Sequence, residues 1–270
     1  MESLWSRTGR KNGRERGNNT SNRNGLSLTL LCRLSDPVWS ATAEPLQMIL
    51  TVGNTKGGVG KTTLAVQIAL SWAIAGRDVL LVDADRQGSA GLVVAVRADA
   101  GKALSVTCVA FHEGAVLRAQ VQRQAPKYDD VVIDAGGRDS GALRAALVLS
   151  DALLVPFMPR ALDVWALADI AALVEEARGV RDGLHAMAVL NGADPGASSD
   201  NADAAAALAD LPNLVLLDAP IRRRKAFGNA MALGLAVDEL TPRDTKASNE
   251  LAALVEALQN HCGPTKSNGE

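Results

Sequence analysis

Residues 55–63 read TKGGVGKTT, and they come two residues after the apolar run 49–52 and open the apolar stretch 61–75. Glycines allow a backbone to wrap closely around phosphate oxygens, so that successive N–H groups point inward. The positive end of a helix that begins at Lys61 adds attraction for an anion. Gly, Lys and Thr together at a strand-to-helix junction are a specific signal. The stretch therefore predicts a phosphate-binding loop.

The order of residues in this loop predicts which groups contact a nucleoside triphosphate. Lys61 is expected to reach the β- and γ-phosphates, the Thr62 hydroxyl to bind Mg²⁺, and Thr63 to donate to the α-phosphate. The predicted contacts from the loop are Lys56, Gly57, Gly58, Val59, Gly60, Lys61, Thr62 and Thr63.

Two further apolar runs end in aspartate. Residues 79–82 lead into Asp83-Ala84-Asp85, and residues 131–133 lead into Asp134. Open α/β sheets bind their ligands at the carboxyl ends of the strands, so these carboxylates are expected beside the phosphates. Asp134 is expected to approach Mg²⁺ through a water or Thr62. The glycines at 136 and 137 predict a flexible segment, and Arg138 after them can be either a contact or a solvated side chain.

The rest of the sequence from Met48 alternates apolar runs with helical stretches, which is typical of βαβ units. Hydrophobic residues make up 47% and aromatic residues 3% of the chain, so an all-β sandwich is disfavoured. The fold class predicted is α/β, with a mostly parallel twisted sheet and helices on both faces. The expected strands are 49–52, 79–82, 104–109, 131–133, 152–155, 185–190 and 214–216, and the expected helices are 61–75, 115–124, 140–149, 163–178, 201–210, 222–233 and 245–259.

Composition divides the chain into three predicted parts. Residues 1–47 contain seven Lys or Arg against four Asp or Glu and show no sustained periodicity, which predicts a disordered basic segment. It either precedes the native start at Met48 or is a basic tail that contacts DNA. Residues 48–262 form the predicted folded domain, and 263–270 a polar tail. The three cysteines are far apart, and no run is long enough for a membrane span.

The loop departs from the ordinary Walker A pattern, because Thr55 replaces a glycine and a second lysine, Lys56, opens it. With this deviant motif, residues 48–260 resemble the ParA/MinD family of P-loop ATPases, of SIMIBI type, and especially the short ParA-type proteins without an N-terminal helix-turn-helix. The resemblance implies ATP and Mg²⁺ as cofactors and a homodimer around two ATP molecules. It implies that Lys56 contacts the partner's nucleotide, that Asp85 orients the attacking water and that Asp83 helps to hold Mg²⁺. Arg86 stands where the family usually has proline.

The resemblance also extends to the base and to DNA. It implies that Asn191 and Pro220 contact adenine, although an Asn-Gly turn explains Asn191 equally well. The only dense cationic cluster of the domain matches the region where ParA relatives grip the DNA backbone without reading bases. A solvated helix face or an acidic partner surface is the competing interpretation of this cluster, which consists of Arg222, Arg223, Arg224 and Lys225.

The function implied is a cytoplasmic, nucleoid-associated ATPase that segregates plasmid or chromosomal DNA or another cargo. ATP would drive dimerisation and nonspecific DNA binding, and a ParB-like partner would stimulate weak hydrolysis of ATP to ADP and phosphate. One alternative is a biosynthetic ligase of the cobyrinate amide-synthase type, which normally has additional substrate domains. The other is a MinD-like positioning ATPase, but the ending 263–270 is too polar for a membrane-binding amphipathic helix, so no membrane partner is expected.

Overall fold

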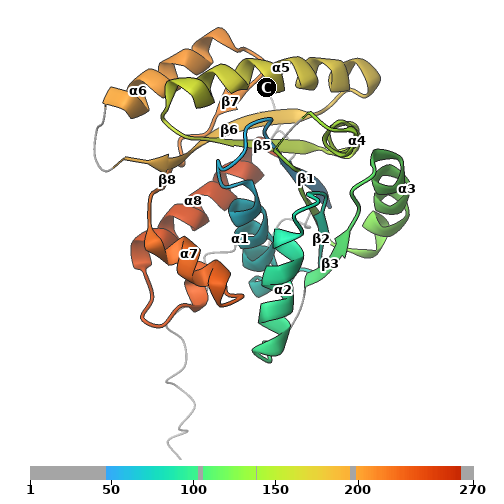
Figure 1. The fold of residues 1–270 in the computed structure, drawn as a ribbon, viewed down its shortest axis with the longest axis vertical. Coiled ribbons are helices and arrows are strands. Elements are labelled where there is room, and N and C mark those ends of the chain that lie inside the picture. The colour runs from blue at the N-terminus through green and yellow to red at the C-terminus, as the bar shows by residue number, and fades with distance from the viewer. Residues whose placement is uncertain (1–46, 103–105, 138, 195–198, 263–270) are drawn as a thin grey trace, which may run out of the picture. The chain divides into compact units, whose positions relative to one another are not determined.

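A computed structural model describes residues 47–102, 106–137, 139–194 and 199–262. Its centre is an eight-stranded sheet in the order β3-β2-β4-β1-β5-β6-β7, with β8 beside β6, and every registered pair is parallel (Figure 1). The strands are β1 Met48–Val52, β2 Val79–Asp83, β3 Val106–Ala110, β4 Asp130–Asp134, β5 Ala152–Phe157, β6 His185–Ala193, β7 Val215–Leu216 and β8 Ile221–Arg222.

Helices cover both faces of this sheet, as Figure 1 shows. Helices α1, α2, α7 and α8 pack on one face, and α3, α4, α5 and α6 on the other. The helices are α1 Lys61–Ile74, α2 Ser89–Asp99, α3 Gly114–Gln124, α4 Gly141–Leu149, α5 Ala161–Val180, α6 Ser199–Ala206, α7 Lys225–Ala232 and α8 Thr245–Cys262, with 3-10 turns at Ala125–Lys127, Ala207–Asp210 and Val237–Glu239.

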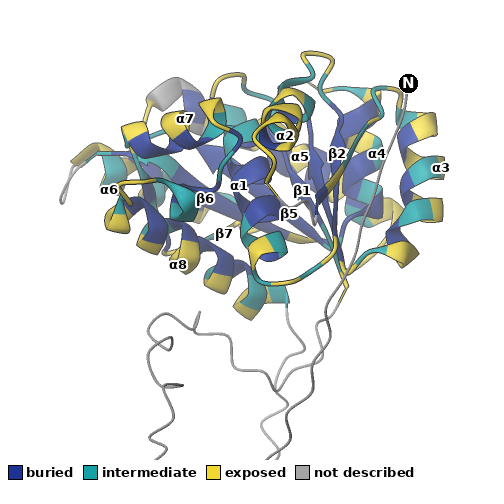
Figure 2. Ribbon diagram, turned by 90° about the horizontal axis from the view of Figure 1, so that it is seen from below, coloured by how far each residue is buried: buried dark blue, intermediate teal, exposed yellow. Residues whose placement is uncertain are grey.

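The core follows from the alternation of side chains along each strand. In β5, Ala152 and Leu154 join the cluster under α1 and α8, whereas Leu153, Val155 and Phe157 join the cluster under α4 and α5. Both faces of a parallel sheet are covered, which explains why the central strands are mostly apolar and mostly buried (Figure 2). The structure confirms the predicted fold class.

Two elements differ from the sequence prediction. Helix α2 was not predicted, because its apolar residues do not form one stripe: Leu92 and Val96 are 67% and 41% exposed. The helix predicted over 222–233 begins only at Lys225, because Ile221 and Arg222 extend the sheet instead and pair with β6. Strand pairing between residues about thirty positions apart therefore overrides the local helical pattern here.

The predictions for the two ends, 1–47 and 263–270, lie outside the described residues except for Gln47. Its side-chain amide donates to the carbonyl oxygen of Tyr128 at 2.9 Å. Within the described ranges, no helix has the length and apolar character needed to cross a bilayer.

Candidate functional site

The predicted phosphate-binding loop connects β1 to α1, and the Asn54 side chain anchors its start by hydrogen bonds. This side chain is fully buried, donates to the Pro156 carbonyl at 2.9 Å and accepts from the Lys56 N–H at 3.0 Å. Gly60 ends the loop at φ 88°, a left-handed conformation that favours glycine, and no side chain caps α1. The first amides of α1 therefore have no side-chain acceptor, which suits an anion.

Lys61 is the buried cation of the site. The residue is only 7% exposed, and its Nζ donates to the Lys56 carbonyl at 2.7 Å. Burial lowers the pKa of Lys61, while the carboxylates of Asp134 and Asp85 oppose this effect. A bound phosphate would offset the burial cost of this ammonium group and would also stabilise its charged form.

Asp134 at the end of β4 is a poorly compensated carboxylate. It is fully buried, and neither carboxylate oxygen has a hydrogen bond of normal geometry. Burial raises the pKa of Asp134 to about 7, although the nearby Thr62 hydroxyl and Lys61 lower it. Buried carboxylates are costly unless a cation or donors compensate them, so this orphaned group fits a cation.

The chemistry of these groups suits Mg²⁺ in particular. Thr62 and Asp134 offer oxygen ligands, and Mg²⁺ typically takes one or two protein oxygens and completes its shell with waters and substrate phosphates. In the described ranges, no group of three or more His, Cys, Asp or Glu side chains forms a metal cage. Thr62 and Asp134 can therefore hold Mg²⁺ only together with a phosphate and water.

The two aspartates that follow β2 have different surroundings. Asp83 is 1% exposed and accepts from the N–H groups of Asp85 at 3.2 Å and Gly91 at 3.0 Å. These bonds fix the turn that leads into α2. Asp85 is partly exposed and accepts from the Gln87 N–H at 3.1 Å. The Mg²⁺ role of Asp83 and the water-orienting role of Asp85 stay predictions.

The glycines after β4 lie next to the phosphate-binding loop and Asp85. A Cβ atom at Gly137 would lie 2.9 Å from Lys61 Nζ and 3.0 Å from Gly57 Cα, and one at Gly136 would lie 3.4 Å from the Asp85 carboxylate. At Gly137, a side chain would crowd the backbone of the phosphate-binding loop. Arg138, which the sequence left open as either a contact or a solvated side chain, is outside the described residues.

Lys56 contacts its own chain in this structure. Its Nζ lies 3.9 Å from Asp163 Oδ1, with the lysine side chain 41% exposed and the aspartate side chain 5% exposed. Thr55 Oγ1 donates to the Ala166 carbonyl at 3.4 Å, so the start of α5 adjoins the loop. The sequence prediction missed Asp163, because an acidic residue in the first turn of a helix is common and marks no site.

The two predicted adenine contacts lie together beside the loop. Asn191 Nδ2 donates to the Val59 carbonyl at 2.6 Å, and a Cβ at Gly60 would lie 2.2 Å from the same nitrogen. Pro220 is next to Ile221, which pairs with Asn191. The structure thus assigns the Asn191 amide to the loop, and adenine contact by either residue stays a prediction.

The predicted DNA residues occupy the junction of β8 and α7. Arg222 and Arg224 both bind Glu250 of α8, while Arg223 and Lys225 are exposed. The four cations therefore divide into two pairs.

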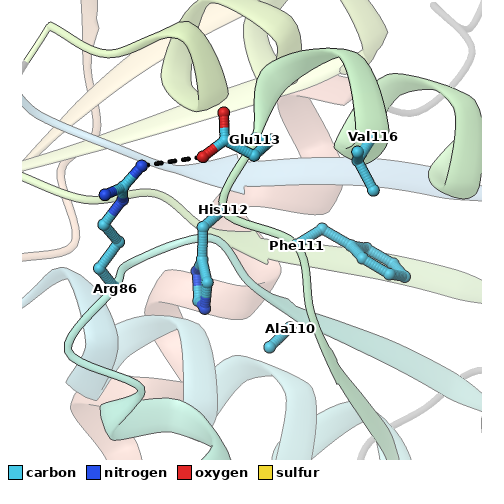
Figure 3. A pocket seen from close by; sticks show the side chains of 6 residues that line it. All are labelled: Arg86, Ala110, Phe111, His112, Glu113 and Val116. Atoms are coloured by element: carbon cyan, nitrogen blue, oxygen red, sulfur yellow. Dashed lines mark hydrogen bonds and ion pairs between the residues drawn. The ribbon is translucent and has the colours of Figure 1, made fainter.

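A cavity of about 330 Å³ lies beside the loop that follows Asp85 (Figure 3). Arg86 Nη2 is 2.8 Å from Glu113 Oε1, so an exposed ion pair joins that loop to the residue before α3. Surface pairs of this kind add little stability. The lining residues are Arg86, Ala110, Phe111, His112, Glu113 and Val116, and none of them was predicted as a site residue.

Comparison with known proteins agrees with this geometry. Residues 50–237 match the family described as the CobQ/CobB/MinD/ParA nucleotide binding domain. The "Maintenance of carboxysome distribution protein A" of Halothiobacillus neapolitanus is 30% identical over 207 residues, covering 76% of this chain and 94% of that protein. The "Chromosome-partitioning ATPase Soj" of Thermus thermophilus is 30% identical over 161 residues, covering 50% and 64%.

A solved structure shows the same fold. The septum site-determining protein MinD of Pyrococcus horikoshii, in complex with Mg-ADP, superposes with a TM-score of 0.64 at 19% identity, covering 81% of this chain and 98% of that one. Nucleotide and magnesium in that structure match the cofactors predicted for this chain. From the family match and the two relatives, we conclude that the chain belongs to the CobQ/CobB/MinD/ParA family of nucleotide-binding domains.

Proposed function

We propose that the chain is a dimerising ATPase that positions a large cargo, DNA or a protein assembly, inside the cell. The observation that supports it most directly is the set of charges around the loop: a buried lysine that donates to a backbone carbonyl, a buried aspartate without a hydrogen bond of normal geometry, and a partly exposed second lysine 3.9 Å from Asp163. A magnesium triphosphate would satisfy the first two. The third remains available to a neighbouring molecule.

The chain's own residues divide the work of ATP binding and hydrolysis. The loop amides and Lys61 would bind and orient the phosphates, and Thr62 with Asp134 would hold Mg²⁺. When bound, Mg²⁺ neutralises charge on the β- and γ-phosphate oxygens. Asp85 orients the attacking water, and its position beside Gly136 connects that water to the segment after β4. Hydrolysis by such a site is slow unless a partner protein completes it.

Dimerisation uses Lys56. In the single chain its ammonium group lies near Asp163, and to reach the nucleotide of a second copy it must leave that carboxylate. ATP favours the move, because a γ-phosphate carries more negative charge than one carboxylate. The dimer would then be the form that binds DNA, since pairing doubles the number of exposed cations.

The two relatives described above support a positioning role. One is named for carboxysome distribution and the other for chromosome partitioning. We propose nonspecific DNA as the surface to which the dimer binds, and a ParB-like or adaptor protein as the partner that triggers release. The cargo is then whatever that partner binds.

Two cysteines bear on the ligase alternative. Burial raises the pKa of Cys108 to about 12 and that of Cys262 to about 11, so both thiols are protonated near neutral pH. A glutamine-cleaving nucleophile needs a thiolate. Neither of these two residues favours the amide-forming branch of the family.

The test measures duplex DNA retention on a filter with ATP, ADP or no nucleotide. The full chain with Asp85→Ala, in which hydrolysis is blocked, should retain DNA with Mg-ATP and far less with ADP. Lys61→Ala is the control, because it removes the buried phosphate ligand and should bind no more DNA with ATP than without. Equal retention in all three nucleotide states would contradict the proposed function.

A further inference from the structure

Strand β3 forms one end of the central sheet and has an open edge. In the described part of the chain, β2 is the strand that pairs with it. Just past β3, the Phe111 N–H donates to the Asp83 carbonyl of β2 at 3.0 Å. Backbone groups alternate between the two edges of a strand, so those of Cys108 and Ala110 point away from β2. This edge presents donors and acceptors with which a further strand can pair.

Proteins usually protect such an edge, and β3 lacks the usual devices. Charged residues, proline, bulges and very short strands all oppose pairing at the end of a sheet. The five residues of β3 read VTCVA, without charge or proline, and their register with β2 is continuous. At the other end of the sheet, β7 has two residues, Val215 and Leu216. Of these two ends, β3 is therefore the one suited to accept a strand.

The cavity in Figure 3 lies at the carboxyl end of this edge. Its lining includes Ala110, which ends β3, and Phe111 and His112, which follow it. Val116 of α3 adds an apolar wall and is 48% exposed. The volume of about 330 Å³ is within the range of pockets that hold ligands. A peptide paired with β3 would lead directly into this cavity.

Exposed cations follow the side of α3 on which Val116 lies. An α-helix turns about 100° per residue, so Arg123 is within about 20° of Val116 around the helix axis. As the helix after a parallel strand, α3 runs back along β3. Arg123 and Lys127 are exposed, and neither has an ion pair within the described ranges. Helix α3 itself contains no acidic residue.

We propose that the β3 edge, the cavity and these two cations together bind an extended acidic peptide of a partner protein. The peptide adds a strand to the sheet and places an apolar side chain in the cavity. Its acidic residues lie roughly two to four positions away, opposite Arg123 and Lys127, because seven helical residues and three strand residues each span about 10 Å.

Backbone chemistry and charge favour this occupant over three others. Duplex DNA has no amides that can pair with a strand edge. A second copy of the chain would bring its own Arg123 and Lys127 to the same edge, where like charges repel. Residues 1–47 contain seven Lys or Arg against four Asp or Glu, so they too are repelled. An acidic strand suits both the edge and the cations.

The cavity also connects this surface to Asp85. Arg86 lines the cavity and directly follows Asp85, and its Nη2 is 2.8 Å from Glu113 Oε1. A side chain that enters the cavity competes with this exposed pair and changes the turn that carries Asp85. This link to hydrolysis rests on the proposed function, whereas peptide binding itself does not.

Random peptides displayed on phage and selected against the full chain supply the probe. We expect the enriched sequences to combine an apolar residue with acidic residues roughly two to four positions away. An enriched peptide is then synthesised, and its affinity for the full chain is measured by fluorescence anisotropy. A selection that enriches no such pattern would contradict the inference.

Backbone methylation of the peptide tests the strand pairing without altering the protein. N-methyl groups on one alternate set of peptide residues should abolish binding, and those on the other set should not, because one edge of the peptide pairs with β3. Ala110→Pro removes an outward N–H and should lower the affinity about tenfold or more, whereas Ala110→Ser keeps the N–H and should not. Equal effects of the two methylated sets would rule out strand addition.

Two charge reversals on α3 test the acidic part of the peptide. R123E should weaken peptide binding about fivefold or more at low salt. R118E is the matched control, because Arg118 is also exposed but lies about 200° from Val116 around the helix axis. Equal losses for the two variants would show that net charge alone drives binding and would overturn the inference.

Two other results would assign the edge to a different occupant and also overturn the inference. One is a nucleotide-free dimer in light scattering that Ala110→Pro dissociates. The other is duplex DNA that binds the parent but not R123E when no enriched peptide does.

The link to Asp85 has its own measurement. A non-hydrolysable ATP analogue with Mg²⁺ should change the affinity of the parent for the peptide about fivefold or more. An unchanged affinity would remove the link. If the analogue does not bind at all, the proposed function is contradicted, while peptide binding without nucleotide still decides the inference.

Discussion

Replacing Asp134 with asparagine should stabilise the nucleotide-free chain and abolish its response to Mg-ATP. The Asp134 carboxylate is buried without a hydrogen bond of normal geometry, and burial raises its pKa from 3.8 to about 7. A carboxyl whose folded pKa lies above its unfolded value loses stability as pH rises between the two. Above about pH 7 the folded chain must bury the charge.

The size of this effect follows from the pKa difference. Each pH unit between about 4 and 7 lowers the free energy of unfolding by about 1.4 kcal/mol, so the full cost at pH 8 is at most about 4 kcal/mol. The new amide gains a donor group that can remain unsatisfied, which costs roughly 1 to 3 kcal/mol. The net gain for Asp134→Asn at pH 8 is therefore about 1 to 3 kcal/mol.

Urea unfolding in EDTA at pH 5 and pH 8 measures this directly. Between pH 5 and pH 8, the free energy of unfolding of the variant should rise by roughly 2 to 3 kcal/mol relative to that of the parent. The reason is that only the parent has a carboxylate that must be buried in its charged form. Mg-ATP should raise the unfolding midpoint of the parent and leave that of the variant unchanged. A variant that is destabilised equally at both pH values would refute the assignment of Asp134 as an uncompensated buried charge.

Two further changes test the loop and its second lysine. Gly137→Ala should weaken ATP binding about tenfold or more in calorimetry. The added Cβ would lie 3.0 Å from the Gly57 backbone and 2.9 Å from Lys61 Nζ. Unchanged affinity would show that the segment moves away freely. Asp163→Asn should tighten the ATP dimer about fivefold in sedimentation, because two Lys56 contacts of about 0.5 kcal/mol each no longer break on assembly. A weaker dimer would mean that Asp163 positions the lysine and does not restrain it.

The features predicted correctly from the sequence are those whose signals are local. The loop at 55–63 and the strand that ends at Asp134 combine a short motif with an apolar run, and both lie at the carboxyl edge of the sheet as expected. Helix α2 has no comparable signal, because its apolar residues are divided between the core and the solvent.

Contacts between residues that are distant in the sequence could not be predicted from it. Glu250 lies 28 and 26 residues from Arg222 and Arg224, and only the packing of α8 against β8 makes it their shared partner. In the same way, the fold alone brings Asp163 to Lys56. The composition of a basic run gives its total charge, whereas the free charge depends on such partners.

The most direct test of the account is the mass of the full chain in saturating Mg-ATP with Asp85→Ala, the change expected to block hydrolysis. Light scattering should give about twice the 28.1 kDa of the single chain, and Lys56→Ala in the same background should return the mass to that of one chain. A mass of one chain for Asp85→Ala, or a dimer that persists without Lys56, would contradict the claim that this lysine serves the neighbouring subunit.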